Sequence, residues 1–409
     1  MSPRSRLLVA LASTALIGYV ALGSLLGRVL GDTSYGQLAI FNEVVRLVVE
    51  AYVEPVNLDR AMAGARLGLG DALDGDSGYL DPEEFRLYQM PVREGEADIG
   101  AVLTRRFSFL MVVSVRPASP AEKAGLRAGD ILKSIDGRHS RPLAVPTGQR
   151  LLRGAPGSVV KLAILRAGSD PIDVSVVRER LTASAPKGKL LEDGTGYLKV
   201  GEFPARAADD VRAEVESLKK SGAKSLVLDL RAAAYGAPEE GVRVAEVFLK
   251  GGVVAKLAGV KVPEQVLSAD PARGVWDGPL AVLVDTGTAG PAEIVAAAML
   301  DSGRAAVVGE HTFGRAGVQK AVPLPEGGLV LTVAKYSSPK GTPIHGRGIE
   351  PSVPVASAEE DEEGQGPHRD LILEKALQVL REGEAPKAAV RSEERRVGKE
   401  CRSRRSPYH

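Results

Sequence analysis

The segment between Leu280 and Lys320 holds the residues best suited to chemistry. It begins with LAVLVD, at 280–285, an apolar run without alternation that predicts a buried strand. A turn rich in threonine and glycine follows, and Pro291 then opens an alanine-rich stretch that predicts a helix. Backbone N–H groups at a helix start can stabilise an oxyanion, so this strand–turn–helix unit is a suitable frame for acyl transfer.

A second strand and loop follow this unit. The run AAVVG, at 305–309, predicts another buried strand, and the sequence EHTFGRAGVQ, at 310–319, predicts a loop. A residue on this later loop can point back at the turn. Two facing groups of this kind are what a nucleophile and its general base require.

The turn and the loop resemble two motifs of the C-terminal processing peptidases, also called tail-specific proteases. In that family the turn typically reads SASASEI and the loop TFGKGxVQ. The middle serine is the nucleophile, the loop lysine is its base, and the glutamine orients the lysine. Here the turn reads TAGPAEI and the loop TFGRAGVQ. The resemblance therefore places Gly290 at the nucleophile position and Arg315 at the base position, while Gln319 and Glu293 match.

These substitutions remove the chemistry that the motifs carry. Gly290 has no side chain with which to attack a carbonyl carbon. Arg315 keeps its proton at physiological pH and cannot act as a general base. The residue after the nucleophile normally donates an oxyanion N–H, and here it is Pro291, which has none. Loss of the nucleophile costs on the order of 10⁶ in rate in subtilisin.

A further change follows the predicted strand SLVLDLR, at 225–231. In the resembling family such a strand precedes NxPGG, whose first glycine supplies another oxyanion N–H. Here the sequence is AAAYG, so Tyr235 stands where that glycine is expected, and its ring would crowd an acyl group. Other hydroxyl, amine and imidazole groups are interpreted as surface or turn residues: Thr288, Ser302, His311, Lys320, Lys335, Ser337, Ser338 and His345.

The N-terminus contains an uncharged apolar run at 7–26, preceded by Arg4 and Arg6. Such a run can span a bilayer with its N-terminus inside. For residues 1–31, a retained membrane anchor and a cleaved signal peptide both stay open. In either case we expect the rest of the chain in the cell envelope, facing the periplasm or exterior, or secreted. Residues 32–95 show apolar positions at helical spacing and predict a helical region.

Residues 96–181 resemble a PDZ domain. The strongest match is SPAEKAGLRAGDILKSIDGR, at 119–138, where a strand enters an Asp-Gly hairpin turn. A PDZ domain adds the C-terminus of a partner as a strand and holds its carboxylate with backbone N–H groups. The expected peptide-binding residues form the carboxylate loop and the start of the next strand: Asp98, Ile99, Gly100, Ala101 and Val102. The alternative is an inert PDZ module that only packs against its neighbour.

Residues 182–355 resemble the peptidase core of the same family, which implies β-β-α units of the ClpP/crotonase-like kind. The expected fold class is therefore mixed α/β and α+β, with a helical N-terminal region, a PDZ domain and this core. Residues 356–390 predict an acidic linker and a short helix. Residues 391–409 shift abruptly to a basic composition. They resemble translated read-through of a sequencing-library adapter, so we exclude them from fold reasoning and expect the natural C-terminus to differ.

Composition limits the remaining possibilities. The tail 391–409 carries a net charge of +4, so the total of +1 leaves −3 for the rest of the chain. The single cysteine, Cys401, also lies in the tail, so the rest has neither disulfides nor thiolate metal ligands. We find no basic stripe for nucleic acid and no ligand cluster for a metal, and we expect no cofactor.

Three functions remain open. The leading hypothesis is a pseudopeptidase that binds peptide C-termini or scaffolds a partner, such as an active peptidase or an envelope protein. The alternative is an active serine endopeptidase with relocated catalytic residues, which cleaves unstructured or C-terminal segments of exported proteins. A third possibility is a purely structural envelope protein with an inert PDZ domain. With each of these functions, we expect the N-terminal segment to make the membrane a partner.

Overall fold

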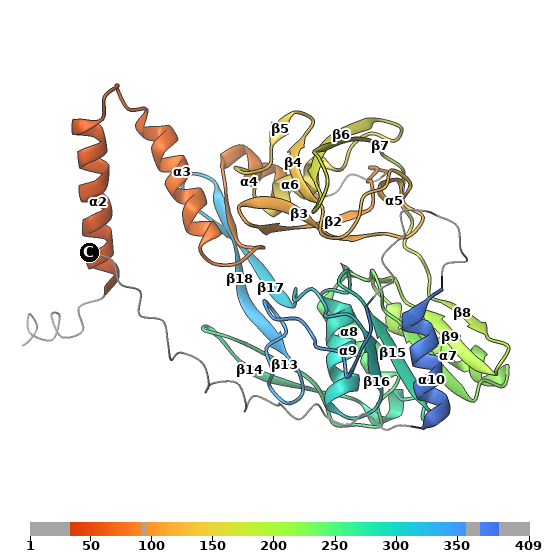
Figure 1. Cartoon of the computed structure of the whole chain (residues 1–409). Helices are drawn as coiled ribbons and strands as arrows, with labels where there is room; N and C mark the ends of the chain where they lie inside the picture. Colours follow the sequence, from red (N-terminus) through yellow and green to blue (C-terminus); the bar gives the residue numbers. More distant parts are fainter. Residues whose placement is uncertain (1–32, 92–94, 357–368, 384–409) are drawn as a thin grey trace, which may run out of the picture. The chain divides into compact units, whose positions relative to one another are not determined.

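The computed structural model describes residues 33–91, 95–356 and 369–383 (Figure 1). The apolar run at 7–26 and the basic tail at 391–409 lie outside the described residues, so the predictions made for them stay predictions. The chain divides into two compact units between Arg66 and Leu67. Within the described stretches, no helix combines the length and the apolar character that a membrane crossing requires.

A helical region precedes the first large sheet, as the spacing of apolar residues predicts. Its helices are α2 (Thr33–Ala51), α3 (Leu58–Asp71) and α4 (Pro82–Gln89). Helix α4 begins with a capping box: the Asp81 carboxylate accepts from Glu84 N at 2.8 Å, and the Glu84 carboxylate accepts from Asp81 N at 3.1 Å. The short strand β1 (Gly78–Leu80) lies just before this cap.

The PDZ region is an antiparallel sheet with the strand order β2-β3-β4-β6-β7, and β5 pairs with β4. Its strands and helices are β2 (Ala101–Arg106), β3 (Phe109–Val115), α5 (Pro120–Lys123), β4 (Ile131–Ile135), β5 (Arg138–His139), α6 (Val145–Leu151), β6 (Val159–Leu165) and β7 (Ile172–Val177). The predicted hairpin turn between β4 and β5 is confirmed, with Asp136 and Gly137 at φ values of 49° and 78°. Strand β2 lies at one end of the sheet.

A mostly parallel sheet forms the centre of the core, with the order β19-β16-β15-β11-β9-β8. Its strands are β8 (Lys187–Leu190), β9 (Thr195–Lys199), β11 (Ser225–Asp229), β15 (Leu280–Val284), β16 (Ala306–Gly309) and β19 (Val353–Pro354). Only β8 runs antiparallel to its neighbour. The buried strands predicted at 225–231, 280–285 and 305–309 are confirmed as β11, β15 and β16.

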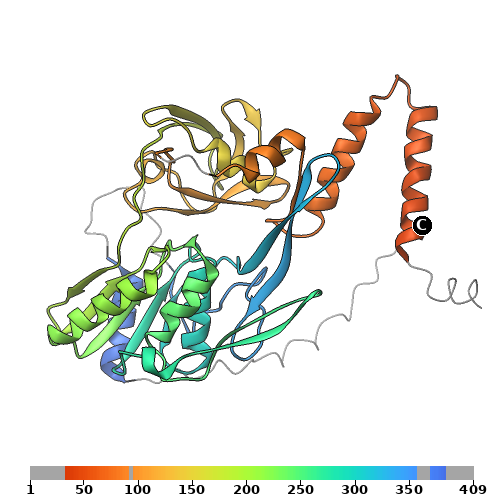
Figure 2. The ribbon, with the colours of Figure 1, turned by 180° about the vertical axis from the view of Figure 1, so that it is seen from behind.

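Helices cover both faces of this sheet (Figures 1 and 2). The helices are α7 (Ala207–Lys220), α8 (Pro238–Glu246), α9 (Pro291–Asp301) and α10 (Leu371–Glu382). Successive strand residues point to opposite faces. Leu228 and Val282 pack with α7, α8 and α9, whereas Val227 and Leu283 pack with α10. The mixed fold class expected from the sequence is therefore confirmed.

A second, antiparallel sheet borders the core. Its strand order is β1-β18-β13-β14, and β17 forms a hairpin with β18. Its longer strands are β13 (Val253–Gly259), β14 (Val262–Ser268), β17 (Gly317–Pro323) and β18 (Gly328–Ser337). The loop predicted at 310–319 is shorter than expected, because Gly317 to Gln319 already pair with β18. The pairing of β1 with β18 fixes the segment before α4 to the C-terminal half of the chain.

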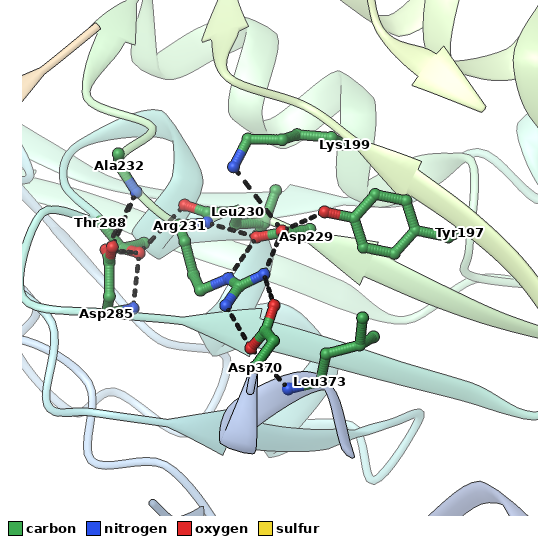
Figure 3. A network of polar contacts seen from close by, with 10 residues as sticks. All are labelled: Tyr197, Lys199, Asp229, Leu230, Arg231, Ala232, Asp285, Thr288, Asp370 and Leu373. Atoms are coloured by element: carbon green, nitrogen blue, oxygen red, sulfur yellow. Dashed lines mark hydrogen bonds and ion pairs between the residues drawn. The ribbon is translucent and has the colours of Figure 1, made fainter. Parts of the chain in front are cut away.

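Arg231 attaches helix α10 to the sheet (Figure 3). Its guanidinium donates to Asp229 at 2.7 and 3.0 Å and to both carboxylate oxygens of Asp370 at 2.8 Å. Asp370 is the N-cap of α10 and accepts from Leu373 N at 3.0 Å. Burial raises the pKa of Asp229, but the hydrogen bond and charge of Arg231, the charge of Lys199 and the hydrogen bond from Tyr197 together leave that pKa below its ordinary value. The same balance lowers the pKa of Asp370.

We expect Arg231→Met to lower the free energy of unfolding by about 3–5 kcal/mol, because it leaves the buried carboxylate of Asp229 without its main partner. Urea unfolding at neutral pH measures this loss. The exposed Arg86, on α4, provides the matched control Arg86→Met, which should be nearly neutral. Equal unfolding midpoints for the two variants would contradict the role assigned to Arg231.

The same network predicts a pH dependence. The folded pKa values of Asp229 and Asp370 lie below their unfolded values. Their contribution to stability is therefore complete above the ordinary aspartate pKa of about 4, and it is lost as the pH falls toward the folded values. We expect Asp370→Asn to unfold with a shallower pH dependence between roughly pH 5 and pH 2 than the unaltered chain. Parallel slopes would exclude Asp370 as one of the linked groups.

Candidate active site

The partly buried carboxylate of Asp285 shapes the turn between β15 and α9 (Figure 3). It accepts N–H groups from Gly287 at 3.0 Å and from Ala232 at 3.0 and 3.1 Å. The Thr288 hydroxyl lies 2.9 Å from the same carboxylate and 3.0 Å from Leu230 O. Burial raises the pKa of Asp285, and the hydrogen bonds from Ala232 and Thr288 oppose that rise. These contacts tie the turn to the loop that follows β11.

Gly290, the residue at the expected nucleophile position, is the N-cap of α9. Its backbone has a φ of 61° and a ψ of −117°, a conformation that residues with a side chain adopt only under strain. A Cβ added to Gly290 would lie 3.4 Å from the carbonyl oxygen of Arg315, which is ordinary contact. The turn and the loop that the sequence analysis paired are therefore adjacent in space.

Glu293 joins this turn to the loop. Its fully buried carboxylate accepts four hydrogen bonds. Gly290 N and Arg315 N donate to Oε2 at 2.9 and 2.8 Å, and Gly314 N and Thr312 Oγ1 donate to Oε1 at 2.6 and 2.5 Å. Burial raises the pKa of Glu293, while the Thr312 hydroxyl and the three N–H groups favour the ionised form. One side chain thus fixes both the start of the helix and the course of the loop.

The Arg315 side chain binds Asp76 of the segment before β1. Its Nε lies 2.9 and 3.1 Å from the two carboxylate oxygens, and the Asp76 side chain is only 4% exposed. Gln319 donates to Thr332 Oγ1 at 3.3 Å. Residues 32–95 were predicted only as a helical region, so Asp76 was not identified from the sequence. The charge of Asp76 was visible, but its place beside Arg315 depends on the pairing of β1 with β18.

Pro291 and Tyr235 occupy the two positions where an oxyanion N–H is expected. Pro291 is the first residue of α9 and has no N–H. Tyr235 belongs to β12 (Tyr235–Gly236), which pairs with β10 (Glu202–Phe203). Its hydroxyl is buried and has no hydrogen-bond partner among the described residues. Burial, followed by the charge of Asp98, raises the pKa of this phenol.

The PDZ sheet contacts the surroundings of Gly290. Val102 and Val113 pack with Ala234 and Ala289 in a small apolar cluster, and Tyr235 lies against it. Val102, one of the expected peptide-binding residues, thus contributes its side chain to this cluster.

Two polar contacts accompany this packing. The Ser114 hydroxyl donates to Ala232 O at 2.7 Å. Arg116 of the PDZ domain forms an ion pair with Glu202, and its guanidinium lies 5.9 Å from the centre of the Tyr235 ring. The sequence analysis singled out neither Ser114, Arg116 nor Glu202, because nothing local marks a contact across a domain boundary.

The expected carboxylate loop leads into β2, which begins at Ala101. Asp98 Oδ1 accepts from Ile99 N at 2.6 Å and from Gly100 N at 3.0 Å. Its second oxygen accepts from Arg153 Nε at 3.1 Å. The backbone N–H groups of this loop therefore converge on a carboxylate, and that carboxylate belongs to the chain itself.

The remaining polar residues do not form a second catalytic pair. His345 lies in a turn as expected, but its imidazole is only 7% exposed and its Nε2 lies 3.7 Å from Asp74. The Ser302 hydroxyl donates to Ala298 O at 2.6 Å, within its own helix end. Ser338 is buried and accepts from Thr342 N at 3.1 Å. In the described part of the chain, no hydrogen bond joins a serine or threonine hydroxyl to a lysine amine or an imidazole, and no cluster of three acidic, histidine or cysteine residues could hold a metal.

Comparison with known proteins agrees with this architecture. Residues 194–355 match peptidase family S41, and residues 111–166 match the PDZ domain. The carboxy-terminal processing protease CtpA of Bacillus subtilis is 30% identical over 351 residues, which are 85% of this chain and 75% of that protein. The carboxy-terminal-processing protease of Bartonella bacilliformis is 32% identical over 332 residues, which are 79% of this chain and 76% of the relative.

The structure also resembles a solved one. The photosystem II D1 C-terminal processing protease superposes with a TM-score of 0.66 and 26% sequence identity, covering 80% of this chain and 95% of that one.

We expect Glu293→Gln to lower the free energy of unfolding by about 2–5 kcal/mol, because an NH₂ group would then face backbone N–H donors in a buried place. Urea unfolding measures the loss, and limited proteolysis of the loop at 310–316 should become faster. The exposed Glu216 of α7 provides the matched control Glu216→Gln, which should stay within about 0.5 kcal/mol of the unaltered chain. A Glu293→Gln variant as stable as this control would show that the four hydrogen bonds contribute little.

Proposed function

Because this chain belongs to the carboxy-terminal processing proteases of peptidase family S41, we propose that it is a catalytically impaired member of that family. In this proposal it is a pseudopeptidase that binds peptide C-termini or scaffolds a partner. The observation that carries the proposal is Gly290. It stands at the helix start opposite the Arg315 loop, where the resemblance places the nucleophile, and it offers no atom that could attack.

The contacts of Arg315 support the same conclusion. A general base must release its proton near neutral pH, and a guanidinium does not. The neighbouring carboxylate of Asp76 also stabilises a positive charge at this place. A lysine introduced at position 315 would meet the same carboxylate, which would keep its amine protonated. Restoring activity therefore requires a change at Asp76 as well as at Arg315.

The oxyanion positions add a third argument. Pro291 removes one N–H donor, and Tyr235 packs its ring where the resemblance places a glycine. Removing a single oxyanion donor costs roughly 10²–10³ in rate. The hydrogen bonds that hold the turn and the loop are nevertheless present. Asp285 accepts from Gly287 N and Ala232 N, and Glu293 accepts from Gly290 N and Arg315 N.

Binding is the activity that the chain retains in this proposal. The PDZ match supports recognition of peptide C-termini, because such domains take up a chain end as an added strand. We further propose that the partner is an active peptidase or an envelope protein. The uncharged run at 7–26, preceded by Arg4 and Arg6, supports a location at the membrane or outside the cytoplasm.

We expect the unaltered full chain to show no multiple-turnover cleavage of an unstructured reporter with an apolar C-terminus. The test variant carries Gly290→Ser, Pro291→Ala, Arg315→Lys, Asp76→Asn and Tyr235→Gly, which restore a nucleophile, a neutralisable amine and the oxyanion N–H groups. Fragment release over hours, measured by mass spectrometry, is the readout.

The matched control replaces Gly290→Ser with Gly290→Ala in the same background, which brings the same backbone strain without a hydroxyl. Cleavage only by the serine-containing variant, or by none of the three chains, agrees with the proposal. Multiple turnover by the unaltered chain would overturn it and would require a nucleophile at another position.

A further inference from the structure

One edge of β2 has no strand beside it in the described chain, because this strand ends the sheet and pairs only with β3. A side chain occupies that edge. The Gln149 amide of α6 donates from Nε2 to Ala101 O at 2.8 Å and accepts at Oε1 from Leu103 N at 3.1 Å. A strand added to this edge would need the same carbonyl and the same N–H group. Gln149 therefore stands where the backbone of a bound peptide would lie.

A second side chain occupies the loop before β2. The Asp98 carboxylate takes the N–H groups of Ile99 and Gly100, and Arg153 binds its other oxygen. The Asp98 side chain is only 16% exposed. A peptide that adds to β2 with its last residue at this end would place its terminal carboxylate at the same N–H groups. Asp98 and Gln149 together thus reproduce the two parts of a peptide C-terminus, the carboxylate and the backbone amide.

We propose that the PDZ groove of this chain is closed by its own side chains, and that a peptide with a free C-terminal carboxylate binds only by displacing Gln149 from β2 and Asp98 from its loop. This inference rests on the proposed function, since it concerns the peptide-binding site of the same domain. Gln149 then sets the affinity threshold. Only peptides whose backbone and carboxylate contacts contribute more binding free energy than the contacts of Gln149 and Asp98 remain bound.

The structure offers a place for the displaced Gln149 side chain. A cavity of about 440 Å³ adjoins α6 and the end of α4, and both Gln149 and Arg153 line it. Its apolar lining includes Leu87, Tyr88 and Met90. Rotation of Gln149 away from β2 therefore leads into open space. The groove can open without unfolding α6, whose backbone hydrogen bonds do not depend on Gln149.

The test titrates the full chain with a fluorescent ten-residue peptide that has an apolar last residue and a free carboxylate. We expect Gln149→Ala to bind about 5- to 50-fold more tightly than the unaltered chain, because the peptide no longer displaces two hydrogen bonds. The same peptide with a C-terminal amide should bind more weakly than the free acid to every chain, since it cannot replace the carboxylate of Asp98. The exposed Gln89 of α4 provides the matched control Gln89→Ala, which should bind like the unaltered chain.

Hydrogen exchange at Leu103 N–H provides a second measurement that needs no peptide. Gln149→Ala should accelerate this exchange at least tenfold, whereas Gln89→Ala should leave it unchanged. Equal and tight peptide binding by all chains, with unchanged exchange, would overturn the closed groove but leave C-terminal peptide binding intact. Accelerated exchange without binding by any chain would instead overturn the peptide-binding function, while the Gln149 contact would stand. Unchanged exchange together with no binding would reject both.

Discussion

The four hydrogen bonds that converge on the buried Glu293 carboxylate constrain everything around the candidate active site. They hold the helix start at Gly290 and the loop at Gly314 and Arg315 in one arrangement. A buried carboxylate is costly unless donors surround it, so the donors and the acid depend on each other. This mutual dependence holds the turn and the loop together, although neither Gly290 nor Arg315 contributes its side chain to the contact.

The PDZ domain packs against the same part of the core. Ser114 donates to the carbonyl of Ala232, and Val102 and Val113 pack beside Tyr235. Tyr235 therefore fills space in this interface. Its buried hydroxyl has no hydrogen-bond partner among the described residues, which makes tyrosine a costly choice for packing alone. The apolar area of its ring offsets part of that cost.

In the PDZ domain, too, side chains of the same chain satisfy backbone N–H and C=O groups. An open strand edge and an open loop of N–H groups would leave donors and acceptors half satisfied in a partly buried place. Gln149 and Asp98 satisfy them within the chain. In our proposal the domain is thereby stable without a bound peptide end, and a peptide that binds competes with these internal groups.

Short-range patterns in the sequence were sufficient to predict the local elements, and the family resemblance pointed to Gly290 and Arg315. Apolar runs predicted β15 and β16, and Pro291 marked the start of α9, because each signal lies within a few residues of the element it specifies. Only the tertiary structure placed Asp76 beside Arg315, 239 positions away, and the Gln149 amide on β2. Such contacts depend on strand register and helix docking, which no local pattern encodes. For the same reason the loop at 310–319 was predicted too long, since the pairing of β17 with β18 sets its end.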